Sequence, residues 1–124
     1  MTLDHKIADE INFAKMYASR GYGQSMESSL DKVRAMQRSY LLQNTDGDHL
    51  NSQILAIESE GAAKAVPLYL SLTMRKLGLG PEQSLNLVFP ASHYFSLAER
   101  FNRLNVDRSG PDYSKEIEQV RQKL

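Results

Sequence analysis

Neither cysteine nor tryptophan occurs in the 124 residues, and neither sign of charge is in excess. Without cysteine the chain forms no disulfide framework and no zinc site with thiolate ligands. The 15 basic and 15 acidic residues give a net charge of zero, whereas a nucleic-acid binder usually carries a basic excess on one face or arm. Nucleic acid is therefore the less expected class of partner. A chain without net charge is also weakly repelled by its own copies, so self-association as a homodimer is readily tolerated.

The chain also lacks a long apolar run. A membrane-spanning helix needs about 20 apolar residues, but the uncharged segment 83–98 is interrupted by Pro90 and by polar side chains. The first 15 residues carry charges throughout and so do not resemble a secretory signal, which has an apolar core. We expect a cytoplasmic protein without membrane contact, in a reducing environment that is compatible with the absence of cysteine.

Apolar residues recur three and four positions apart over the first half of the chain, which is the period of one helix face. The first predicted helix ends at the glycine turn 21–23, because glycine disfavours a helix interior and adopts the left-handed cap conformation. The second helix begins at Ser25 or Ser28, and the third begins at Asp48, a good N-cap residue. The three predicted stripes are Leu3, Ile7, Ile11, Ala14 and Ala18, then Met26, Leu30, Val33, Met36 or Gln37 and Tyr40, then Leu50, Ile54 and Ile57.

Segment 61–81 is the only long segment without a polar face. Pro67 lies inside it, and the residue before a proline is steered away from helical geometry. Either the third helix ends near Gly61 and a new helix begins with Pro67 in its first turn, or one long helix is kinked there. We favour the break, with a separate helix over Pro67–Leu77. A helix that is apolar on all sides is a buried one, so Pro67–Leu77 is predicted to be the central helix of the core. Gly78 followed by Leu79 indicates a Schellman ending.

The remainder of the chain contains three further predicted helices. A short one covers 80–88, and the next begins with Ser92 as its cap and extends to Leu104. Residues 105–110, with the sequence NVDRSG, are predicted to form a polar linker to a C-terminal helix over 111–124.

These patterns predict a single all-α domain, 1–124, of about six or seven helices packed around the central apolar helix Pro67–Leu77. A chain of this length buries about two-thirds of its unfolded surface, which is enough for one core without disulfides or metals.

No pattern of catalytic or metal-binding residues occurs in the sequence. His5, His49 and His93 are far apart, and none has a second ligand three or four residues away on a shared helix face. The polar segment 44–48 lacks the glycine and glutamate that a calcium loop requires at its sixth and twelfth positions. The glycine turn 21–23 lacks the lysine of a phosphate-binding loop. We therefore expect no enzymatic activity, no metal and no cofactor.

Interaction with another protein is the function that these observations favour, as an adaptor, a regulator or a small inhibitor of a larger assembly. The helix that follows Ser92 carries more aromatic side chains than one core face readily hides, and Tyr and Arg are enriched at interface hot spots. The alternative, which the sequence favours over contact with a partner, is that these aromatic side chains belong to the core. The C-terminal helix has a narrow apolar stripe that could pack on the domain or lie in a groove of a partner. The predicted contact residues are Tyr94, Arg100, Arg103, Tyr113, Ile117 and Val120.

A small DNA-binding regulator is the alternative. Residues 83–104 could form a helix-turn-helix, and SHYFSLAERF resembles the second such motif of AraC-type activators, which contains a Tyr-Phe-Ser-Arg-x-Phe stretch. Here the second phenylalanine, Phe101, follows Ser96 two residues too late, which turns it by about 200° around the helix, and no residue roles are carried over. Because phosphate contacts need basic side chains, the zero net charge makes this the weaker hypothesis.

Overall fold

The computed structural model describes residues 3–43, 47–80 and 87–124, with side chains described over 4–38 in the first of these ranges. These ranges contain five helices: α1 (Leu3–Arg20), α2 (Gly23–Gln43), α3 (Gly47–Lys76), α4 (Ala91–Asp107) and α5 (Ser114–Arg121). No strand occurs within them. The all-α prediction is confirmed for the described part of the chain, whereas the predicted number of six or seven helices is not matched.

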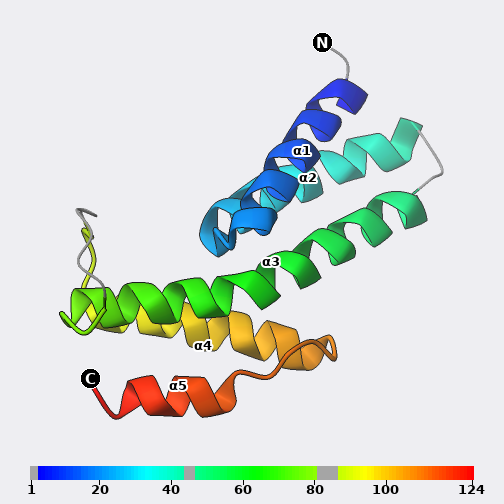
Figure 1. The fold of residues 1–124 in the computed structure, drawn as a ribbon. Coiled ribbons are helices and arrows are strands. Elements are labelled where there is room, and N and C mark those ends of the chain that lie inside the picture. Colours follow the sequence, from blue (N-terminus) through cyan, green and yellow to red (C-terminus); the bar gives the residue numbers. More distant parts are fainter. Residues whose placement is uncertain (1–2, 44–46, 81–86) are drawn as a thin grey trace.

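α3 is the helix on which the other four pack. α1 and α2 form a helical hairpin against its N-terminal half, and α4 runs antiparallel along its C-terminal half (Figure 1). α5 lies on the outer side of α4 (Figure 1). Buried side chains from all five helices form one hydrophobic core, so the described residues make a single compact domain.

The apolar stripes predicted for the first two helices are the faces that enter this core. α1 and α2 are amphipathic, so burial of one stripe from each helix closes the hairpin and supplies the surface that packs on α3. The stripe residues that the structure places in the core are Ile7, Ile11, Ala14, Ala18, Met26, Leu30 and Val33.

Gly21 forms the turn between α1 and α2, as predicted. Its φ is 76°, and its N–H donates to the carbonyl of Ala18 at 3.1 Å, which is part of a Schellman ending. A Cβ at Gly21 would lie 2.7 Å from the carbonyl oxygen of Lys64, so the glycine also allows the turn to lie directly against α3. α2 then begins at Gly23, before either of the predicted serine caps.

α3 is one helix across Pro67, so the favoured break at this residue is wrong and the alternative of one long helix is the one that the structure has. A proline inside a helix removes a hydrogen bond and costs about 3 kcal/mol, but Ala65 and Val66 are fully buried and Tyr69 is nearly so. The burial on both sides of the proline offsets the local cost, and the ring itself is exposed. α3 changes direction part-way along its length (Figure 1), which is the usual effect of an internal proline.

The extent of the central helix and its exposure to solvent also differ from the prediction. Its buried residues extend from Leu50 to Thr73 rather than over Pro67–Leu77 alone. Lys64 and Pro67 are exposed, so the helix keeps a solvent-facing stripe and is not enclosed on all sides.

The C-terminal end of α3 agrees with the prediction. Gly78 has a φ of 75°, its N–H donates to Arg75, and the N–H of Leu79 donates to Met74 at 2.9 Å. These two bonds define the Schellman motif. Of the predicted short helix over 80–88, residues 81–86 lie outside the described residues, and 87–88 are not helical.

α4 begins at Ala91 with Pro90 in the N-cap position, and no side-chain cap bond is formed, so Ser92 is not the cap. The helix continues to Asp107 and thus includes half of the predicted linker 105–110. Asn105 explains this extension, because it is 2% exposed and its Nδ2 donates to the carbonyl of Ala62 on α3 at 3.1 Å. The connection to α5 therefore covers 108–113.

Glu58 on α3 is a buried carboxylate that binds two arginines from different helices. Arg34 on α2 pairs with one of its oxygens, and Arg108 after α4 pairs with the other at 3.2 Å. Its side chain is 9% exposed. Because a buried charge is very costly without partners, these pairs fasten the hairpin and the end of α4 to the same point of α3.

We expect Pro67→Ala to stabilise the protein. The proline has no N–H to donate to the carbonyl of Ala63, and alanine restores that bond, so the free energy of unfolding should rise by about 1–3 kcal/mol in urea denaturation. The exposed Ser59→Ala on the same helix is the control and should change it by less than about 0.5 kcal/mol. A loss of stability in Pro67→Ala would contradict this account of α3.

We expect Glu58→Gln to destabilise the fold by about 1–3 kcal/mol, because two guanidinium groups lose their carboxylate. Glu60→Gln is the matched control: its pair with Lys64 is half-exposed on both sides, and such pairs contribute about 0–1 kcal/mol. Equal denaturation midpoints for the two variants would show that the Glu58 pairs do not hold the helices together.

Candidate protein-interaction site

The described residues contain no group of three or more His, Asp or Glu side chains that could hold a metal ion. His5, His49 and His93 lie on α1, α3 and α4 respectively. None of the helices in the described ranges is both long and apolar enough to cross a membrane.

Three of the predicted contact residues are buried in the domain itself. Tyr94, Ile117 and Val120 are 8%, 5% and 8% exposed, and Tyr113 is half-buried beside them. The narrow stripe of α5 packs on α3 and α4, so in this structure it offers little surface to another molecule.

The two predicted arginines differ in their surroundings. Arg100 binds Glu27 on α2, and its guanidinium lies 5.0 Å from the centre of the Phe101 ring, so it joins α4 to the hairpin. Arg103 is exposed and lines a cleft of about 320 Å³ between α4 and α5. The helix-turn-helix hypothesis concerns residues 83–104. Of these, 83–86 lie outside the described residues. The helix expected to read DNA corresponds to α4, which is covered by α3 and α5 on two sides (Figure 1).

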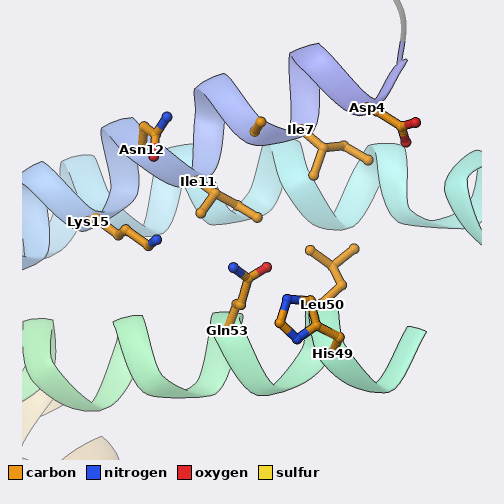
Figure 2. Close-up of a pocket in the computed structure, with 9 residues that line it drawn as sticks. Asp4, Ile7, Ile11, Asn12, Lys15, His49, Leu50 and Gln53 are labelled. Atoms are coloured by element: carbon orange, nitrogen blue, oxygen red, sulfur yellow. The ribbon is translucent and has the colours of Figure 1, made fainter. Parts of the chain in front are cut away.

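One cleft, of about 240 Å³, lies between α1 and α3 (Figure 2). Ile7 and Ile11 point from α1 toward Leu50 of α3, and all three are only 4–5% exposed. Gln53 extends into the gap, whereas Asn12 points away from it (Figure 2). The apolar floor is thus already packed, and little of it remains for a ligand.

A larger groove, of about 460 Å³, lies between α1 and α2. The largest apolar side chain in its lining is Phe13, which is 50% exposed and lies one position before the core residue Ala14, on a different side of α1. We call it the Phe13 groove, and its lining residues are Lys6, Asp9, Glu10, Phe13, Lys32, Ala35 and Met36.

Both signs of charge surround the apolar centre of the Phe13 groove. Lys32 pairs with Glu10 across the two helices at 3.8 Å. Lys6 and Asp9 form no ion pair with any residue that the structure describes. The edge of the groove thus carries one positive and one negative side chain without an ion pair in the part of the chain that the structure describes.

The sequence prediction did not include Phe13. The available signal was a large aromatic side chain on the otherwise polar side of an amphipathic helix, next to the predicted stripe. Phe89 is equally exposed at 49%, but it follows the segment 81–86, which is not described, and its ring contacts His93 at a centroid distance of 4.3 Å.

A polar cluster fastens the start of α5 to α4. The Oδ1 of Asn102 accepts the N–H of Tyr113 at 2.8 Å, and its Nδ2 donates to Asp112 at 3.2 Å. Asp112 also accepts the N–H and the hydroxyl of Ser114. These hydrogen bonds hold the pKa of Asp112 below its usual value. The bond from the Ser114 hydroxyl has the largest effect, and the bond from the Asn102 amide comes next.

Comparison with known protein families, with curated proteins and with solved structures finds no match to this chain.

We expect the docking of α5 to weaken in acid through Asp112. Its folded pKa is lower than its usual value of 3.8, so its contribution is complete above that pH and is lost as the pH falls through the lower folded pKa. The difference in unfolding free energy between the wild type and Asp112→Asn should therefore shrink below pH 3.8. A difference that stays constant from neutral pH to pH 2 would contradict the assignment.

Proposed function

We propose that this protein is a non-enzymatic protein-interaction module that binds an amphipathic helix of another protein in the Phe13 groove. The observation that carries the proposal is the half-exposed Phe13 ring in the lining of a groove of about 460 Å³ between two helices.

The shape of the groove supports a helical partner. Two adjacent helices of a hairpin leave a shallow channel between them, and such channels receive amphipathic helices whose apolar anchors repeat every three or four residues. Phe13, Ala35 and Met36 supply an apolar floor, and aromatic side chains and Met are enriched in the cores of interfaces. Burial of the exposed half of Phe13 is worth about 1 kcal/mol by its area alone.

The charges at the edge of the groove support a partner with both acidic and basic side chains. Lys6 and Asp9 lie three residues apart, on neighbouring turns of α1, and are unpaired within the described residues. They can therefore set the direction in which a partner helix lies, since complementary charges at a rim contribute mainly specificity and association rate.

The test begins with a photo-crosslinking amino acid in place of Phe13 in the source cell, with the same substitution at Leu55 as control. Leu55 on α3 is 51% exposed and lies outside the groove. A protein crosslinked only from position 13 is then purified, and its affinity is measured for the unmodified chain and for each alanine variant.

We expect Phe13→Ala to weaken this binding by at least about tenfold, or 1.4 kcal/mol, without loss of stability, because the ring is half-exposed. Leu55→Ala should retain the affinity within about threefold. Equal affinity of both variants would refute the Phe13 groove as the site. Duplex DNA binding that falls steeply with salt would instead favour the DNA-binding alternative.

A further inference from the structure

We infer that α5 is an exchangeable helix: in a dimer, α5 of each copy occupies the surface of α4 and α3 that its own α5 covers in the single chain. The partner is thus a second copy of this protein. The inference concerns the opposite side of the domain from the hairpin and does not depend on the Phe13 groove.

Few side chains hold α5 on α3 and α4, and the residues of these two helices that they contact precede the connecting segment. Ile117 and Val120 are its only buried side chains. Arg121 pairs with Glu99 at 2.7 Å and lies 5.5 Å from the centre of the Phe95 ring. A second copy presents the same residues, so α5 would make the same contacts on it.

The segment between the helices carries backbone strain. Ser109 has a φ of 58° and is the only described residue other than glycine with a positive φ. This conformation is unfavourable for residues with a Cβ. It is held by hydrogen bonds from Ser109 to Val106 at 3.1 Å and from Gly110 to Asn105 at 2.7 Å.

Strained and short connections favour exchange of an element between copies, because opening the connection releases the strain while the docking contacts are kept. The segment 108–113 spans at most about 20 Å when extended, which is enough to reach a copy lying beside α4. Pro111 fits an extended strand-like connection because its φ is restricted. The zero net charge of the chain does not oppose the approach of two copies.

The first experiment changes the connection in the full chain. A variant without Ser109 and Gly110 cannot return α5 to its own α4, so light scattering should show a dimer at micromolar concentration. Ser109→Gly, which removes the strain, should raise the dimer dissociation constant at least fivefold over the wild type. Ile117→Asp should be monomeric, since its α5 can dock on neither copy.

A monomeric deletion variant with folded α1–α4 would overturn the inference. So would a dimer that persists when Ile117→Asp is added to the deletion, because the contact would then lie elsewhere.

The second experiment remains informative if the deletion variant fails to fold. Glu99→Arg and Arg121→Glu each place like charges between α4 and α5, but exchange between the two variants restores an opposite pair at both sites. Mixed in equal amounts at low salt, they should form a heterodimer by native mass spectrometry, at least tenfold more abundant than either homodimer. A mixture that contains only monomers, or the two homodimers in equal proportion to the heterodimer, would refute the exchange.

Discussion

The continuity of α3 across Pro67 is the constraint on which the rest of this fold depends. One half of the helix carries the α1–α2 hairpin and the other half carries α4. The contacts that join these parts meet near its middle, where Glu58 binds two arginines and Ala62 accepts a hydrogen bond from Asn105. A separate helix after Gly61 would be free to turn relative to the first, and these contacts could not all form together.

The two ends of the domain are held in different ways. The hairpin is closed by its own apolar stripes, so Phe13 on its outer side remains half-exposed and contributes little to the core. At the other end α5 is joined through a strained connection and a small buried surface. Ion pairs such as Arg100 with Glu27 join neighbouring helices of the domain, so these charges serve the fold.

Local patterns predicted the amphipathic helices well and their surroundings less well. Ile7, Ile11, Ala14 and Ala18 are buried as their spacing indicates. The same kind of spacing made Ile117 and Val120 candidates for contact with a partner, since an apolar stripe looks the same whether it faces its own domain or another molecule. Phe13 was missed for a related reason. It lies one position away from the buried stripe residue Ala14, and on a helix a shift of one position turns a side chain from the core to the surface.

Local sequence was sufficient to predict two of the helix ends: the glycines at 21 and 78 adopt positive φ and end their helices through bonds to residues three and five positions earlier. These are local events that need no other part of the protein. Tertiary structure decided whether α3 breaks at Pro67, where α4 ends, and that Glu58 is buried between two arginines. Each of these depends on burial against residues far away in the chain, whose energy outweighs the local preference.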